Sequence, residues 1–157
     1  VNGPTNSGNG ALDANGTISA NGGFLVAVGS SGMAEYPAGT STQNVIAITL
    51  PQAQQAGTIV RIVDENGADL LTFAPAKSYN SVVFSSPDIK SGSTYTAYVG
   101  GEYSGGENVD GLMASGSYAG GTSSGNVKVS QILSTIGSGG GGMGGPGGRP
   151  DKKPGKW

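Results

Sequence analysis

The stretch Asn44-Val-Ile-Ala-Ile-Thr-Leu50, with Thr58-Ile-Val-Arg-Ile-Val63 and Leu70-Leu-Thr-Phe73 after it, decides the fold class. In the first stretch, apolar residues alternate with small or polar ones, and this period of two predicts a strand with one buried face. The turn Asp64-Glu-Asn-Gly67 between the second and third stretches is typical of a β-hairpin. We therefore expect antiparallel β-structure from residue 44 onwards.

Towards the C-terminus the same pattern continues in three further apolar runs, at residues 81–84, 94–99 and 127–133. About six strands at short spacing, with no long helical pattern, predict a small Ig-like β-sandwich over residues 44–136. A glycine-rich stretch, residues 100–125, interrupts it. A loop of this length inside a compact domain is usually either functional or disordered.

Towards the N-terminus the pattern changes to Asn-Gly pairs every six residues, at Asn9, Asn15 and Asn21. Such pairs tolerate the positive φ of tight turns, and a short fixed period is typical of solenoids. Aligning Gly3 with Gly29 gives a coil of about 26 residues. We therefore expect incomplete parallel β-helix coils over residues 1–36 and a linker over residues 37–43.

Composition and charge narrow the class of protein. The 157 residues include 31 Gly and 8 Pro but no Cys or His, which excludes disulfides and removes the commonest zinc ligand and general base. Charged residues make up only 11% of the chain, well below the roughly 25% of typical soluble domains. We expect an extracellular or cell-surface protein that binds no nucleic acid, inserts into no membrane, and derives from a longer exported chain, since it begins with valine.

Several segments carry a resemblance to known proteins. They are VNGPTNSGNGALDANG (1–16), NGGFLVAVGSSGMAE (21–35), LTFAPAKSYNSVVFSSP (71–87), SGSTYTAYVGG (91–101) and GGGGMGGPGG (139–148). In this order they are similar to the C-terminal portion of a bacterial cell-surface family of β-helical carbohydrate-binding-domain proteins. The resemblance implies the end of a β-helix followed by a small β-domain, and binding of pectin-like acidic polysaccharides or cellulose.

The resemblance also implies calcium at acidic turns of the coils, and Asp13 is the acidic turn position matched here. Together with Asn9 and Asn15 it offers oxygen ligands, of which Ca²⁺ needs 6–8. The alternative is a structural ladder in which these side chains close turns through hydrogen bonds to the backbone. A second acidic group, Glu102, Glu107 and Asp110, lacks the spacing of a calcium-binding loop, and we expect it to be solvated.

Aromatic residues are candidates for stacking on sugar rings. We assign this role to Tyr36, Tyr103 and Tyr118, and expect the remaining tyrosines, Tyr79, Tyr95 and Tyr98, to belong to the sandwich. Catalysis is not expected, because no pair of carboxylates is evident for glycoside hydrolysis and no basic residue precedes Arg61.

Two functions remain open. In the first, the protein is a non-catalytic structural or adhesive module that self-associates into oligomers or filaments through its open coil, which offers unpaired backbone groups, and its glycine-rich tail, residues 137–157. The tail from residue 149 carries +3, whereas residues 1–148 carry −5. In the second, the protein is a monomeric carbohydrate-binding module. The residues expected at a subunit interface are Val1, Asn2, Phe24, Val26, Met143, Arg149 and Trp157.

Overall fold

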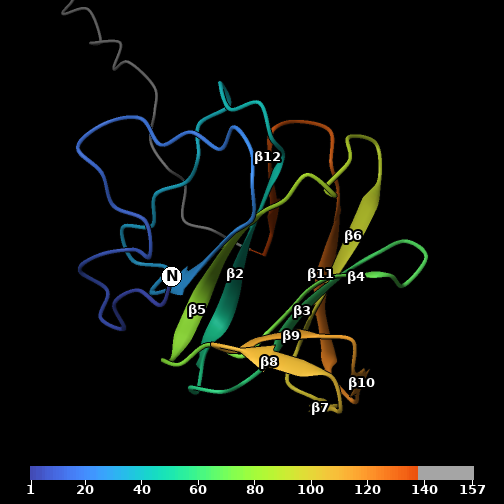
Figure 1. Ribbon diagram of the computed structural model, residues 1–157. Coiled ribbons are helices and arrows are strands. Elements are labelled where there is room, and N and C mark those ends of the chain that lie inside the picture. The colour runs from blue at the N-terminus through green and yellow to red at the C-terminus, as the bar shows by residue number, and fades with distance from the viewer. Residues whose placement is uncertain (138–157) are drawn as a thin grey trace, which may run out of the picture.

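The computed structural model describes residues 1–137, and every regular element within them is a β-strand (Figure 1). No helix in this part of the chain could cross a membrane. The strands are β1 (Leu25–Gly29), β2 (Val45–Gln54), β3 (Val60–Asp64), β4 (Asp69–Phe73), β5 (Tyr79–Ser85), β6 (Thr94–Val99), β7 (Glu102–Ser104), β8 (Glu107–Val109), β9 (Leu112–Ala114), β10 (Ser117–Ala119), β11 (Thr122–Lys128) and β12 (Leu133–Ile136).

Two sheets pack face to face as a β-sandwich, which confirms the all-β, antiparallel prediction. The four-stranded sheet has the order β1-β5-β2-β12, and the six-stranded sheet has the order β11-β6-β3-β4-β9-β8. All pairings are antiparallel except that of β12 with β2. The alternation seen in the sequence explains β2, because Ile46 and Ile48 lie in the core between the sheets while Val45 packs on the outer face.

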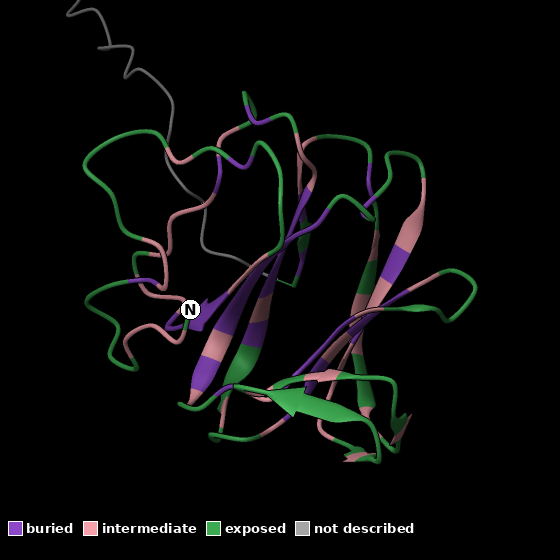
Figure 2. Cartoon of the chain, viewed as in Figure 1, coloured by how far each residue is buried: buried purple, intermediate pink, exposed green. Residues whose placement is uncertain are grey.

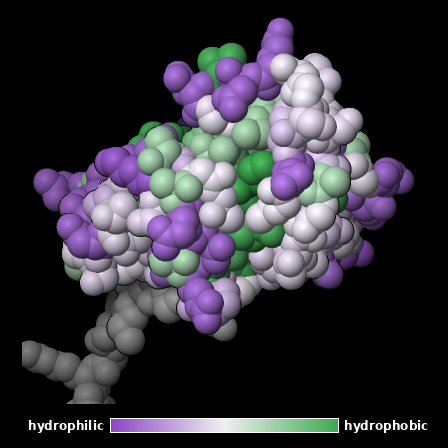
Figure 3. Space-filling view, turned by 90° about the horizontal axis from the view of Figure 1, so that it is seen from below, coloured by the Kyte–Doolittle hydropathy of each residue, from purple (hydrophilic) through white to green (hydrophobic). Residues whose placement is uncertain are grey.

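The core between the sheets is the main apolar cluster, and Figure 2 shows buried residues along the strands of both sheets. Tyr95 ties one end of it together: its hydroxyl donates to the carbonyl of Asp88 at 3.2 Å and accepts from the N–H of Lys90 at 2.7 Å. A tyrosine that bonds back to the chain just before its own strand recurs in such sandwiches. Seen from below, apolar atoms are also visible in a hollow among more polar surroundings (Figure 3).

One predicted strand is wrong. The apolar run 127–133 was expected to be a single strand, but β11 ends at Lys128 and β12 begins at Leu133. The two strands belong to different sheets, so the residues between them cross from one sheet to the other. Val129 is fully buried in this crossing, where it packs into the main core. A buried connection between two sheets and a buried strand both appear in the sequence as a run of apolar residues. Periodicity alone therefore does not distinguish them.

The glycine-rich stretch 100–125 is a folded β-hairpin rather than an open loop. Val99 pairs with Thr122, Ser104 with Ser117, and Val109 with Leu112, so one register runs from the sandwich to the tip. The tip is Asp110-Gly111, and both residues have the positive φ that two-residue hairpin turns require. In Figure 1, β7 and β10 lie below β6 and β11. Beyond them β8 and β9 turn back, and β9 pairs with β4 at the far side of the sheet.

The N-terminal segment lies on the outer face of the four-stranded sheet, coloured blue at the left of Figure 1. The described residues show no solenoid of regular parallel strands. Residues 1–24 contribute one parallel bridge, between Asn2 and Val28, and the apolar run expected to be a coil strand is β1, paired antiparallel with β5. The run from Leu25 to Gly29 is nevertheless a strand. Its apolar residues are buried on both faces of the sheet, with Val28 in the main core and Ala27 in the cluster on the outer face.

Candidate functional site

The outer face of the four-stranded sheet is covered by two successive passes of the chain, residues 1–24 and residues 30–44. They pack over a second apolar cluster, separate from the main core. Its buried members are Ala20, Ala27, Val45 and Val83, and its partly buried members are Ala11, Leu12, Leu25, Tyr36 and Leu133.

Hydrogen bonds join the two passes in sequence order. The N–H of Ala38 donates to the carbonyl of Ile18 at 2.9 Å, and the N–H of Gln43 donates to the carbonyl of Ala20, also at 2.9 Å. Side chains complete the contact: a carboxylate oxygen of Glu35 accepts from the N–H of Ala14 at 2.8 Å. The first pass is therefore held by the second, through both backbone and side-chain groups.

At the start of the first pass, the backbone continues the sheet beyond β1. The N–H of Val28 donates to the carbonyl of Val1 at 3.0 Å, and the N–H of Gly3 donates to the carbonyl of Val28 at 2.7 Å. The terminal amine of Val1 donates to the carbonyl of Val26 at 2.7 Å. Because Val1 and Gly3 use these groups towards β1, the N–H and C=O of Asn2 point to the opposite, open side.

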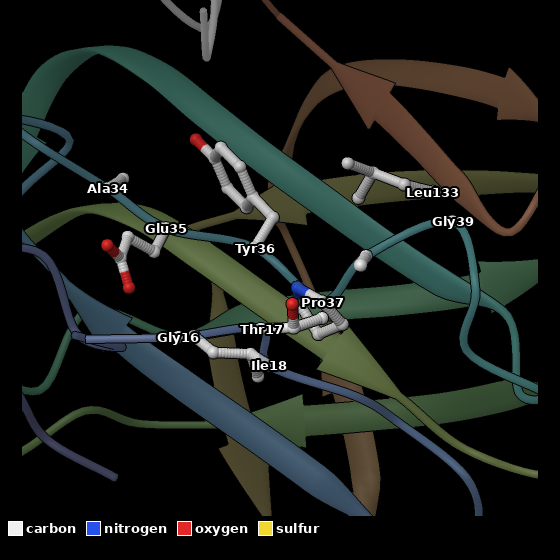
Figure 4. Close-up of a pocket in the computed structure, with 10 residues that line it drawn as sticks. Gly16, Thr17, Ile18, Ala34, Glu35, Tyr36, Pro37, Gly39 and Leu133 are labelled. Carbon is white, nitrogen blue, oxygen red and sulfur yellow. The ribbon is translucent and has the colours of Figure 1, made fainter. Parts of the chain in front are cut away.

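A groove of about 740 Å³ opens between the two passes and β12. Figure 4 shows Thr17 and Ile18 on the first pass, Glu35 and Tyr36 on the second, and Leu133 from β12. Apolar side chains thus line the groove together with one aromatic ring, one carboxylate and two hydroxyls, those of Thr17 and Tyr36. The complete lining is Gly16, Thr17, Ile18, Ala34, Glu35, Tyr36, Pro37, Ala38, Gly39 and Leu133.

The other two tyrosine candidates lie together, but away from this groove. Tyr103 and Tyr118 face each other across the β7–β10 ladder. Both hydroxyls are used within the hairpin: Tyr118 donates to the carbonyl of Gly100 at 2.8 Å, and Tyr103 accepts from the N–H of Gly116 at 2.6 Å. These contacts give the two rings a role in holding the hairpin folded.

An arginine that the sequence reading did not single out explains how the hairpin is held to the six-stranded sheet. Arg61 lies in β3 with its guanidinium 4.7 Å from the centre of the Tyr118 ring, a cation–π contact, and forms an ion pair with Asp69. The hydrogen bond to Asp69 raises the pKa of Arg61, and burial raises the pKa of Tyr118. A charged residue between the core residues Val60 and Ile62 was the available signal.

The structure brings no metal site together at the predicted residues. Asn9, Asp13 and Asn15 are all exposed, and no hydrogen bond among the described residues involves their side chains. Residues 1–137 contain no cluster of three or more Asp, Glu, His or Cys side chains arranged to hold a metal ion. Asn21, from the third Asn-Gly pair, closes no turn either: its Oδ1 accepts from the N–H of Thr42 at 3.1 Å and so bonds the first pass to the second.

The predicted interface residues are distributed over one edge of the molecule. Val1 is 62% exposed and Phe24 is 50% exposed, although the Phe24 ring packs edge-on against Phe84 at 5.4 Å. Asn2 is half-buried, and its Oδ1 accepts from the N–H of Ala76 at 2.9 Å, while Val26 packs against the main core. The remaining predicted interface residues, Met143, Arg149 and Trp157, lie outside the described residues.

Comparison with known proteins adds no relative. No family model matches the sequence, and no curated protein or solved structure matches it either. The functional argument therefore depends on the geometry of this chain.

Proposed function

We propose that this protein is a non-catalytic structural or adhesive β-module of the cell surface, which joins to other copies through the open side of its first pass. The observation that carries the proposal is the one-sided pairing of residues 1–4, which bond to β1 and leave Asn2 directed outwards. An open backbone edge is a template for strand addition.

The arrangement of the two passes supports the terminal coils of a β-helix as the finer description of this region. Asn2 pairs with Val28 at an offset of 26 residues, which is the coil length given by aligning Gly3 with Gly29. In the sandwich, β2 lies beside β5 in one sheet and β3 lies beside β6, with β11 beyond it, in the other, which supports an Ig-like description. The module would thus be the end of a β-helix joined to an Ig-like sandwich, as in the cell-surface family that the sequence resembles.

Charge supports a contribution from the tail. Residues 1–148 carry four basic and nine acidic side chains, whereas Arg149 and the lysines after it give the last nine residues +3. Opposite charges on the body and the tail of neighbouring copies would favour their encounter at low salt.

Sedimentation velocity at micromolar concentration tests the proposal. The full chain should sediment as species larger than the monomer, and removal of residues 138–157 should weaken that association. Replacing Asn2 with Pro removes the outward N–H without touching the bonds made by Val1 and Gly3, and it should weaken association as well. Asn2→Ala is the matched control, since it removes the side chain and keeps the N–H. A full chain that remains monomeric would contradict the proposal.

The groove favours a second candidate function, binding of a saccharide. Tyr36 offers a ring for stacking, and neither its hydroxyl nor that of Thr17 forms a hydrogen bond among the described residues. Concave sites that combine apolar walls with a few polar groups are typical of ligand sites. Of the described residues that line the groove, Glu35 is the only one with a carboxylate, which fits binding rather than hydrolysis by a carboxylate pair.

Affinity electrophoresis in gels that contain pectin or cellulose derivatives, with and without calcium, tests this candidate. Tyr36→Ala should abolish any retardation, and Tyr36→Phe, which keeps the ring, should preserve most of it. Equal retardation of all three proteins would exclude the groove as the site. If the retardation requires calcium, the turn residues Asn9, Asp13 and Asn15 become candidate calcium ligands.

A further inference from the structure

Within residues 1–137, no strand pairs with the outer side of either edge of the four-stranded sheet, and both edges run in the same direction. β1 and β2 are each antiparallel to β5, so they are parallel to each other. Residues 1–4 are parallel to β1 at one edge, and β12 is parallel to β2 at the other. One edge of this molecule can therefore meet the other edge of a second copy only as parallel strands, if the sheet is to continue in the same orientation.

The open side of β12 can be identified from its pairing with β2. The N–H of Val45 donates to the carbonyl of Ile132 at 2.7 Å, and Leu133 is the residue opposite Val45. In a parallel ladder of this register, Ser134 directs its backbone groups to β2. Leu133 and Thr135 then direct theirs to the open edge.

The two edges are complementary. We propose that copies of this chain join head to tail, with residues 1–4 of one copy adding in parallel to β12 of the next and Asn2 lying opposite Ser134. In this register the N–H of Asn2 would donate to the carbonyl of Leu133, and the carbonyl of Asn2 would accept from the N–H of Thr135. The inference deepens the self-association proposed above and rests on it.

The side chains fit the same register. Asn2 pairs with the core residue Val28, so its side chain is on the inner face of the sheet. Ser134 is also on the inner face, because it pairs with Ile46. Joined at this pair, the two sheets would continue with inner face beside inner face and outer face beside outer face.

Apolar contact would accompany the backbone bonds. In the proposed register Val1, which is 62% exposed, lies beside Leu133 at the wall of the groove. Gly3 lies beside the exposed Thr135 and adds no side chain there. A contact between two different edges is heterologous, so it generates an open filament unless the rotation between copies closes a ring.

Two edge variants and their mixture test the inference. Asn2→Pro blocks one edge, and Thr135→Pro blocks the other by removing an outward N–H; proline is tolerated on edge strands at such positions. Asn2→Ala and Thr135→Ala are the matched controls, and circular dichroism with thermal melting checks that all four variants are folded. Each proline variant alone should sediment as a monomer, and each alanine variant should assemble like the unchanged chain.

An equimolar mixture of the two proline variants should form dimers and nothing larger, because one intact edge of each kind remains. If one proline variant still dimerises alone, the contact joins two identical edges and the inference is overturned. If only Thr135→Pro still forms large species, the first pass joins a surface other than β12, which overturns the inference but keeps the proposed function. If both variants still form large species, association uses another surface, and both the inference and the proposed contact are overturned. If the unchanged chain is itself monomeric, both are overturned.

Discussion

The folded hairpin of residues 94–128 and the N-terminal segment of residues 1–24 are both rich in glycine, yet they satisfy their backbones differently. The hairpin pairs with itself in a nearly continuous register from the sandwich to its tip, with one bulge between Ser123 and Gly125. The backbone of the N-terminal segment bonds instead to residues that follow it by about 20 to 27 positions, and residues 1–4 bond on one side only. The glycine-rich backbone of the hairpin is therefore paired with itself, which we call closed, whereas that of the N-terminal segment leaves one edge unpaired at residues 1–4, which we call open.

The largest effect should come from the bends of the hairpin. Gly106 has a φ of 70°, and a Cβ there would clash with the carbonyl oxygen of Ala114. Gly106→Ala should lower the free energy of unfolding by about 3 kcal/mol, since left-handed strain of roughly 1–2 kcal/mol adds to the clash. Its neighbour Gly105 has a similar φ of 69° but open space around the same position. Gly105→Ala should therefore cost only about 1 kcal/mol.

Urea unfolding of both variants measures the difference. A Gly106→Ala protein no less stable than Gly105→Ala would mean that the bend does not confine the backbone as described.

The equivalent change in the N-terminal segment should have a smaller effect. Gly10 is buried, and a Cβ there would lie 2.7 Å from the Cα of Ala34 on the second pass. Its φ is not positive, so Gly10→Ala adds crowding without left-handed strain, and we expect a cost of about 1–2 kcal/mol. Gly16 faces open space, and Gly16→Ala should change stability by less than about 0.5 kcal/mol.

Thermal melting of the Gly10 and Gly16 variants compares the two positions. Equal melting temperatures would show that the first pass is not packed against the second.

The sequence predicted the sandwich well because its strands are encoded locally, by alternation around Ile46 and by the turn at Asn66-Gly67. The outer part of the hairpin was missed because its strands β7, β8, β9 and β10 are each three residues long, below the length at which a period of two is visible. The groove could not be predicted, since it joins Ile18 and Tyr36 to Leu133, about a hundred residues later. The offset of 26 residues was predicted, but not the pairing of β1 with β5.

Alkaline pH should lower the free energy of unfolding of the sandwich. Burial raises the pKa of Tyr79, whose hydroxyl donates to the carbonyl of Thr58 at 2.9 Å. The unfolded chain releases this proton near pH 10 while the folded protein retains it, so stability is full below pH 10 and falls as the pH rises through and above it. The slope is at most about 1.4 kcal/mol per pH unit for one group.

Tyr79→Phe should remove that part of the slope between pH 10 and 12, as measured by urea unfolding at each pH. Tyr118, whose pKa burial also raises, should contribute in the same direction, so Tyr118→Phe tests the hairpin separately. An unchanged slope in both variants would show that neither phenol is protected by folding.

The smallest effect should be the coupling between the hairpin and the sheet beneath it. The Arg61 guanidinium lies over the Tyr118 ring, and because both side chains are partly exposed, we expect this cation–π contact to be worth about 0.5–1 kcal/mol. A double-mutant cycle of Arg61→Met and Tyr118→Leu should return a coupling energy of that size. Because Arg61 also pairs with Asp69, the single change Arg61→Met should cost more than the coupling alone. A Phe24→Leu and Tyr118→Leu cycle is the control. It should give a coupling near zero, because the Phe24 ring packs against Phe84 while the Tyr118 ring packs against Arg61. A zero coupling in the first cycle would mean that Arg61 and Tyr118 do not hold the hairpin to the sheet, and that the pairing of β9 with β4 does so. The two regions would then differ only in how their backbone groups are paired.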